Sequence, residues 1–242
     1  MAKSESILKK ANTRMNRREA LGALGAMGAV SAALALGCAG ETVAGPSTTG
    51  TTTTTTGTNA ACAVTPTETI GPYPSLVDLF RSDIREGKSG TLLALTVKVV
   101  NTNSSCAGVP NANVEIWHVD AAGDYSQYGS QASQTFLRGI QTTNANGEVT
   151  FTTIYPGWYQ GRATHIHLEV TINGVSRKVT QIAFPESVNN TVHTAGAYAS
   201  RGANPMTNTA DGIFADSLAS ELVTPTGSTA GYAATFQVAI AL

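Results

Sequence analysis

Two histidines in one short motif are the first candidates for chemistry in this chain. Thr164-His165-Ile166-His167 lies in a run that alternates like a β-strand, and side chains two residues apart on a strand point to the same face. Both imidazoles would therefore reach a common point, as a metal clamp requires. A His-x-His pair alone is only a weak signal, because surface strands also carry polar residues at alternate positions.

Two tyrosines add oxygen donors to this pair. Tyr159 ends the segment 155–159 (Tyr-Pro-Gly-Trp-Tyr), and Tyr125 ends the segment 117–125 (Trp-His-Val-Asp-Ala-Ala-Gly-Asp-Tyr). Two imidazoles and two phenolates form a nitrogen and oxygen set without a soft thiolate. Such a set disfavours structural zinc and copper(I) and favours a hard trivalent ion. That ion would keep both tyrosines deprotonated.

These motifs resemble those of the intradiol ring-cleavage dioxygenases, the family that includes protocatechuate 3,4-dioxygenase and catechol 1,2-dioxygenase. The likeness covers about residues 62–242. It begins at 65–73 (Thr-Pro-Thr-Glu-Thr-Ile-Gly-Pro-Tyr), which is similar to the family's opening motif, and includes 81–85 (Arg-Ser-Asp-Ile-Arg), frequent in its secreted branch. Six positions match the family's functional residues in order: Tyr125, Tyr159, Arg162, His165, His167 and Gln181.

The resemblance implies one non-haem iron(III) ion per chain, with Tyr125, Tyr159, His165 and His167 as its ligands. It also implies a catechol-type substrate and O2. The ring would open between its two hydroxylated carbons and give a muconate-type diacid. Tyr159 would leave the metal when the substrate binds and would accept a substrate proton, while the other three ligands stay.

Two further catalytic residues follow from the same resemblance. Arg162 would stabilise negative charge that builds up on the ring, and Gln181 would support Arg162 by a hydrogen bond. Only two residues separate Tyr159 from Arg162, fewer than in the protocatechuate enzymes, so the pocket wall there must differ. The choice among catechols stays open.

A β-sandwich is the expected scaffold for these residues. Apolar side chains alternate along 93–100, and similar strand-like runs follow at 114–117, 149–155, 165–172, 179–184 and 235–240. Asn173-Gly174 separates two of these runs, as a tight hairpin requires. We therefore predict an all-β, antiparallel sandwich with long loops, the longest at 121–139 and 186–231.

The first sixty residues have a different character from the rest. Residues 1–38 combine a basic start with an uncharged run rich in Ala, Gly and Leu, which is typical of a signal peptide, and Asn16-Arg17-Arg18 resembles a twin-arginine export signal. Cys38 ends that run in a sequence that resembles a lipobox, where it would be lipidated and attach the protein to a membrane. The alternative is a cysteine inside a discarded signal peptide.

The expected organisation is thus a signal peptide (1–38), a Thr-rich linker (39–60) and one domain (61–242), exported to the cell envelope or the exterior. Without residues 1–38, nine Lys and Arg face fourteen Asp and Glu, a formal charge of −5, which disfavours nucleic acid as a partner. The even pair Cys62 and Cys106 predicts a disulfide, with two buried thiols as the alternative. The oligomeric state cannot be read from the sequence.

Two other classes of protein compete with the dioxygenase. A zinc or copper hydrolase could use the His-x-His pair, but a third ligand at a recognisable spacing is missing. A non-enzymatic binding module could keep the scaffold without the chemistry. Among single residues, we expect Trp117 and Trp158 to pack and His118 to be a hydrogen-bonded structural histidine, whereas Tyr73 could pack or line a pocket.

Overall fold

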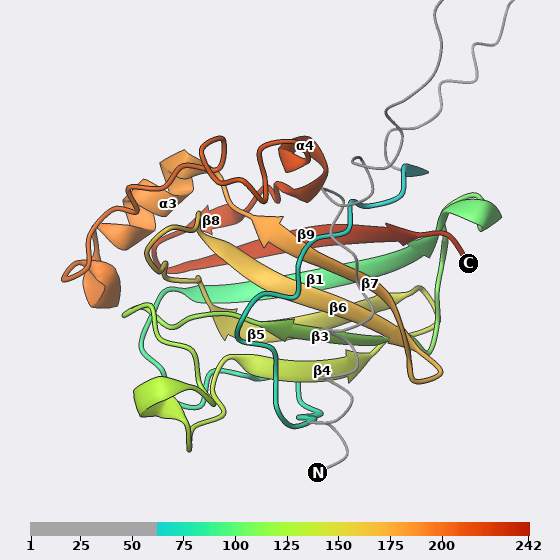
Figure 1. Cartoon of the computed structure of the whole chain (residues 1–242), viewed down its shortest axis with the longest axis horizontal. Coiled ribbons are helices and arrows are strands. Elements are labelled where there is room, and N and C mark those ends of the chain that lie inside the picture. The colour runs from blue at the N-terminus through green and yellow to red at the C-terminus, as the bar shows by residue number, and fades with distance from the viewer. Residues whose placement is uncertain (1–61) are drawn as a thin grey trace, which may run out of the picture. The chain divides into compact units, whose positions relative to one another are not determined.

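The computed structural model describes residues 62–242, which form two β-sheets packed against each other (Figure 1). One sheet has the order β2-β1-β9-β8 with β5 on β1: Leu92–Asn101 (β1), Ala107–Gly108 (β2), Glu148–Ile154 (β5), Thr226–Ser228 (β8) and Gly231–Ile240 (β9). The other has the order β4-β3-β6-β7: Asn113–Trp117 (β3), Arg138–Thr142 (β4), His165–Ile172 (β6) and Val175–Ala183 (β7). The predicted all-β sandwich is confirmed. The predicted signal peptide with Cys38 and the predicted linker lie outside the described residues.

One strand pair departs from the antiparallel expectation. β9 pairs with β1 in parallel from Leu93↔Tyr232 to Asn101↔Ile240, whereas the other six strand pairs are antiparallel. Alternation of apolar residues gives the buried face of a strand but not its direction. The long connection between β7 and the hairpin of β8 and β9 allows either direction.

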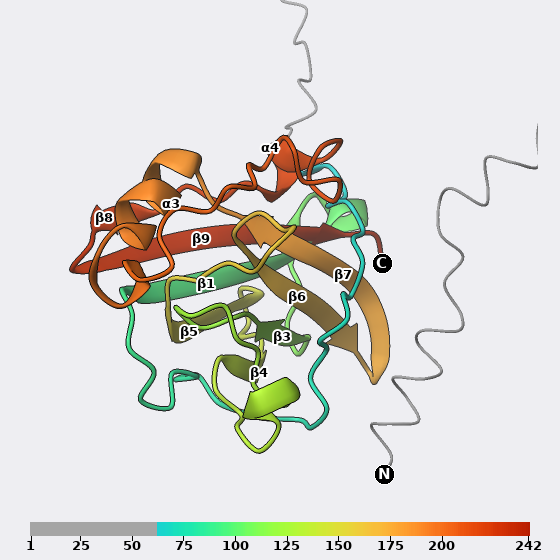
Figure 2. The same cartoon turned by 60° about the vertical axis from the view of Figure 1, so that its left-hand side comes forward.

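Helices are short and lie in the connections. Within residues 62–242, two α-helices lie along one side of the sandwich in both views (Figures 1 and 2): Glu186–His193 (α3) and Leu218–Glu221 (α4). The described connections also contain single-turn 3-10 helices at Thr102–Ser104, Gly129–Gln131 and Gly196–Tyr198. No helix of the described part of the chain is long and apolar enough to span a membrane.

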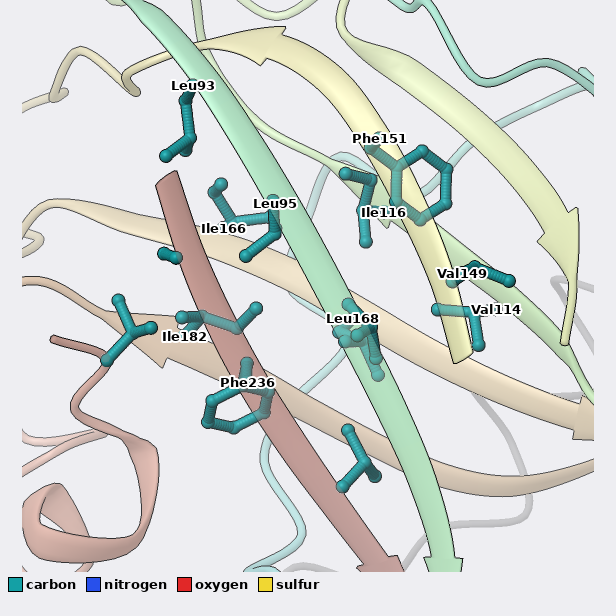
Figure 3. Packing of buried hydrophobic residues seen from close by; sticks show 14 of the residues in the cluster. Leu93, Leu95, Val114, Ile116, Val149, Phe151, Ile166, Leu168, Ile182 and Phe236 are labelled. Atoms are coloured by element: carbon teal, nitrogen blue, oxygen red, sulfur yellow. The ribbon is translucent and has the colours of Figure 1, made fainter. Parts of the chain in front are cut away.

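The core fills the space between the two sheets. Leu93 and Leu95 of β1 and Phe236 of β9 lie opposite Ile166 and Leu168 of β6 (Figure 3). Because successive side chains of a strand point to opposite faces, the histidines that alternate with Ile166 and Leu168 lie on the outer face of the four-stranded sheet. The site therefore forms on the side of β6 that faces away from the main core.

The hairpin between β6 and β7 has the predicted turn. Ile172 pairs with Val175, so Asn173 and Gly174 form a two-residue loop, and both have positive φ values, 51° and 74°. This is the pattern of a type I′ turn, which Asn-Gly favours. The turn, together with a one-residue register shift between Val170 and Thr171, sets the pairing that places Gln181 beside His167.

The N-terminal segment crosses the outer face of the four-stranded sheet. Thr65 N–H donates to the Ala239 carbonyl (2.9 Å), and Glu68 N–H donates to the Val179 carbonyl (2.9 Å). Cys62 forms a disulfide with Cys106, with the two Cα atoms 5.7 Å apart. The segment is thereby held at its start, and it continues over β6 and β7 toward the two histidines.

Candidate metal centre

His165 and His167 converge on one buried point. Both lie on β6, and their Nε2 atoms are 3.1 Å apart. His165 is 3% exposed and His167 is fully buried. His167 pairs with Trp117 of β3 on one side and with Gln181 of β7 on the other, so the strand ladder fixes its position from both sides. The sheet thus brings the predicted histidine pair together.

Hydrogen bonding orients the His165 ring. Its Nδ1 lies 2.6 Å from the Ala163 carbonyl, which can only accept, so Nδ1 carries the hydrogen. Burial, followed by the nearby Arg162 charge, lowers the pKa of His165 to about 3. The ring is therefore neutral, and its Nε2 offers a lone pair toward His167. Such an outer hydrogen bond is typical of a metal-binding histidine.

The His167 ring is held by packing. It lies parallel to the Trp117 indole, with ring centroids 4.9 Å apart and 2° between the planes. Burial lowers its pKa well below the ordinary value, with His165 as the next cause, and its Nδ1 has no hydrogen-bond partner. Gly71 passes so close to the ring that an added Cβ would lie 2.7 Å from its Cε1. Only a glycine fits against the ring at this position.

Tyr125 and Tyr159 complete the cluster. Their ring centroids are 5.7 Å apart. The Tyr125 ring lies 6.2 Å from the His167 ring, and the Tyr159 ring lies 5.5 Å from the His165 ring, measured between centroids. The Tyr125 hydroxyl is buried without a hydrogen-bond partner, and burial raises its pKa well above the ordinary value. A buried phenol in this position is costly unless a cation supplies a partner and draws off its proton.

The donor set fits a hard trivalent ion. Two neutral imidazole nitrogens lie 3.1 Å apart in a buried position, and the rings of two phenols lie beside them, 6.2 Å (Tyr125 to His167) and 5.5 Å (Tyr159 to His165) away. Within residues 62–242, no three His, Cys, Asp or Glu side chains gather where they could hold a metal ion. The further donors offered here are phenol oxygens, which suit iron(III) better than a structural zinc.

Arg162 and Gln181 lie beside the cluster and are hydrogen-bonded to each other. Arg162 Nη2 donates to Gln181 Oε1 (2.6 Å), and Gln181 Nε2 donates to the Thr69 carbonyl (3.0 Å). Arg162 N–H donates to the Tyr159 carbonyl (3.3 Å) across a turn in which Gly161 has φ +87°. The short spacing noted in the sequence therefore forms a tight turn that returns Arg162 to Tyr159.

Burial raises the pKa of the Tyr159 phenol, and the Arg162 charge opposes this shift. Tyr159 is only partly buried, unlike Tyr125, which is 6% exposed. The two phenols therefore have different surroundings. Tyr125 is enclosed, while Tyr159 lies between a cation and an open cavity.

A cavity of about 240 Å³ opens beside the two tyrosines. Its lining contains four aromatic rings in addition to polar residues and glycines: Tyr73, Gly123, Asp124, Tyr125, Tyr128, Gly129, Ser130, Gln131 and Tyr159. The Tyr73 ring lies 4.8 Å from that of Tyr125 and 5.2 Å from that of Tyr128. Tyr73 thus lines the pocket. Tyr128 was missed from the sequence, although it is an aromatic residue three positions after Tyr125.

A larger hollow of about 680 Å³ lies over the outer face of β1 and β9, beside α4, and shares no lining residue with this cavity. Its lining is mostly alanine and threonine. None of the four ligand candidates lines it, so we assign the chemistry to the smaller cavity.

The remaining histidines and Arg138 have structural surroundings. His118 contacts the Val119 carbonyl and Thr153 Oγ1, both at 2.8 Å, and burial lowers its pKa to about 4, as expected for a structural histidine. His193 lies at the end of α3, where its Nε2 contacts the Pro156 carbonyl (3.0 Å). Arg138 is fully buried and binds Ser126 and the Tyr73 carbonyl, so it supports the pocket wall from behind.

The two tryptophans pack as expected. Trp117 stacks on His167, so its packing contact is with a ligand candidate. Trp158 donates from Nε1 to the Gly202 carbonyl (2.9 Å) and carries the Arg201 guanidinium over its ring, 4.2 Å from the centroid. This pair anchors the long loop that follows α3.

Comparison with known proteins agrees with this geometry. The sequence model of the family described as Dioxygenase matches residues 74–201, more than half of the chain. An intradiol ring-cleavage dioxygenase from Tetranychus urticae is 31% identical, with a TM-score of 0.67, over 74% of this chain and 95% of that one. The chain therefore belongs to the intradiol ring-cleavage dioxygenases, a family that uses non-haem iron.

Two further relatives give the range of the likeness. The dioxygenase domain of a carbohydrate-binding fusion protein from Streptomyces sp. SirexAA-E is 25% identical, with a TM-score of 0.58, over 74% of this chain and 99% of that one. The protocatechuate 3,4-dioxygenase beta chain of Burkholderia cepacia is 32% identical over 132 residues, 49% of this chain and 54% of that protein. The chain spans about half the length of the curated relatives it matches.

Proposed function

We propose that this protein is a non-haem iron(III) dioxygenase that opens catechol-type rings between the two hydroxylated carbons and yields muconate-type diacids. One observation carries the proposal above all others: two neutral imidazole nitrogens lie 3.1 Å apart in a buried position, and the ring of Tyr125, whose buried hydroxyl has no hydrogen-bond partner, lies 6.2 Å from that of His167. Tyr125, Tyr159, His165 and His167 would hold one iron ion per chain. Family membership supports the reaction type.

The four ligand candidates would have two kinds of role. His165, His167 and Tyr125 are enclosed and oriented, so they would stay in place through the reaction. Tyr159 is partly buried and borders the cavity, so its Oη would accept a proton from the incoming catechol. When bound, iron(III) would withdraw electron density from the catecholate and make the ring reactive toward O2.

Arg162 would stabilise negative charge on the ring, because its guanidinium borders Tyr159 and is held by Gln181. Gln181 is itself held in place by a hydrogen bond from its Nε2 to the Thr69 carbonyl in the N-terminal segment. Both residues act through charge and hydrogen bonding from outside the ligand set.

The cavity favours a flat aromatic substrate. Tyr73, Tyr125 and Tyr128 form its aromatic wall, and aromatic rings pack well at centroid distances of roughly 4.5–7 Å. A single-ring catechol is the substrate class of the right shape.

We also propose export through the twin-arginine route, with Cys38 as a lipid anchor at the cell envelope. The motifs in residues 1–38 support this location. Nucleic acid is not proposed as a partner, given the −5 formal charge of residues 39–242.

Oxygen uptake tests the proposed activity. Iron-loaded protein should consume one O2 per catechol and form a muconate-type product that absorbs in the ultraviolet. His167→Ala should lose both iron and turnover, whereas Asp216→Asn, at an exposed position, should retain both. No uptake by iron-loaded protein with any of a panel of substituted catechols would rule out the proposed activity. Stoichiometric zinc with hydrolase activity would support the competing hydrolase reading.

A further inference from the structure

We propose that Asp211 is a positioning residue of this site, which holds both the Arg162 side chain and the backbone that orients His165. The inference rests on the proposed function and adds a residue from a distant loop to it. Asp211 is 2% exposed, and its Oδ2 accepts from Arg162 Nε (2.8 Å) and from Ala163 N–H (2.7 Å).

The first contact fixes the plane of the guanidinium. Asp211 binds Nε, and Gln181 Oε1 binds Nη2 at 2.6 Å. Two anchors on different nitrogens of a planar group leave it little freedom to rotate. Neither anchor uses Nη1.

The second contact reaches a metal-ligand candidate through the backbone. Asp211 binds the N–H of Ala163, and the carbonyl of the same residue accepts from His165 Nδ1. A single carboxylate thus ties the charged side chain and the His165 ring to one point. Phe214, three residues further along, lies 6.4 Å from the His165 ring and 5.8 Å from the Arg162 guanidinium.

The loop that carries Asp211 is attached at a second place. Asn204 Nδ2 donates to the Arg162 carbonyl at 3.0 Å. The long irregular stretch after α3 therefore covers the back of the site and fixes Arg162 from two directions. This gives a role to a stretch whose sequence shows no strand pattern.

A purely structural role for Asp211 makes a different prediction. Its Oδ1 accepts from Ile213 N–H (2.9 Å), and its carbonyl accepts from Phe214 and Ala215 N–H, so it also closes a turn. If turn closure were its only role, Asp211→Asn, which keeps an oxygen and the side-chain size, would lower stability without changing Arg162.

Two measurements on the purified protein separate these roles. The first uses metal-free protein and follows the Arg162 Nε–H signal in a ¹H–¹⁵N spectrum, assigned by its disappearance in Arg162→Ala. We expect slow hydrogen exchange in the wild type and in the exposed control Asp216→Asn, and at least tenfold faster exchange in Asp211→Asn. Unchanged exchange in Asp211→Asn would overturn the proposal.

The second measurement is steady-state oxygen uptake with catechol by iron-loaded protein. Asp211→Asn should lower kcat by about 10- to 100-fold, as is typical for a group that orients a metal site, with KM changed less than threefold. In the Arg162→Ala background the same substitution should lower kcat by a smaller factor, because only the contact to the Ala163 backbone remains to be lost. An equal loss in both backgrounds would overturn the positioning role.

These outcomes also distinguish a failure of the proposed function from a failure of the inference about Asp211. If the wild type loads iron but consumes no O2, the proposed function fails, while the exchange measurement still decides whether Asp211 holds Arg162. If the wild type is active and Asp211→Asn matches it, the inference about Asp211 fails and the function stands.

Discussion

The close approach of Gly71 to His167 gives a sharp test of how the N-terminal segment shapes the site. Gly71 has φ +74°, a left-handed conformation, and an added Cβ would lie 2.7 Å from Cε1 and 3.3 Å from Nε2 of the imidazole. Gly71→Ala must therefore strain the backbone and push the ring of a ligand candidate. Both effects should appear, and a control can separate them.

The expected cost follows from these two terms. A left-handed conformation costs a residue other than glycine about 1–2 kcal/mol, and forcing an atom into a packed site costs about 1–3 kcal/mol. Gly87 is a matched control, because its φ is +76° and an added Cβ there meets nothing within 4 Å. Gly87→Ala should show only the backbone term. The difference between the two variants isolates the contact with His167.

Urea unfolding of metal-free protein measures the free energy of unfolding of both variants, and metal analysis measures their iron content. We predict that Gly71→Ala loses about 1–3 kcal/mol more than Gly87→Ala and binds iron less tightly, whereas Gly87→Ala loads iron like the wild type. Equal losses of stability with equal iron content would refute the close packing of Gly71 on His167.

Three further predictions concern other parts of the molecule. Burial raises the pKa of the Glu221 carboxyl from 4.5 to about 7, so the folded state holds this proton more tightly than the unfolded state does. The free energy of unfolding should therefore fall, by up to about 3 kcal/mol, as pH rises from 4.5 to above 7. Glu221→Gln should remove that slope in urea titrations at a series of pH values, and an unchanged slope would contradict it. Replacing Cys62 and Cys106 by serine should cost about 2–5 kcal/mol in the same assay, and no change would mean that the bond does not stabilise the domain. Tyr159→Phe should keep iron but shift the visible absorption and slow turnover, whereas an unchanged spectrum would exclude Tyr159 as a ligand.

Much of the sandwich could be predicted from alternation alone. The range 165–172 coincides with β6, because its apolar residues alternate with the histidines and continue to the Asn-Gly turn. The ranges 179–184 and 235–240 were too short, since β7 begins at Val175 and β9 at Gly231. Apart from the buried Lys178 and Tyr232, the first residues of these strands are exposed or small, and pairing with a neighbouring strand sets their conformation, so they show no hydrophobic pattern.

Other elements left no periodic signal. β4 begins with Arg138, a charged residue that is fully buried through hydrogen bonds to Ser126 and the Tyr73 carbonyl. Hydrophobicity cannot identify such a position, because tertiary hydrogen bonds allow the burial. α3 has eight residues, too few for a clear helical period.

The residues of the site also differ in whether local sequence could predict their positions. Local spacing was enough to pair His165 with His167, whereas Tyr125 was only a candidate oxygen donor by residue type until the resemblance to a family assigned it as a ligand. Asp211 is 49 residues from Arg162, and the closeness of Gly71 to His167 depends on how the N-terminal segment crosses the sheet. Such contacts are properties of the folded chain and have no local pattern in the sequence.

The identity of the bound metal tests the central claim most directly. Protein expressed with ample iron should contain one iron per chain and be burgundy-red, with a visible band from tyrosinate-to-iron(III) charge transfer that is weakened in Tyr125→Phe. A colourless protein without iron after such expression would contradict the assignment of Tyr125, Tyr159, His165 and His167 as the ligands of an iron(III) centre.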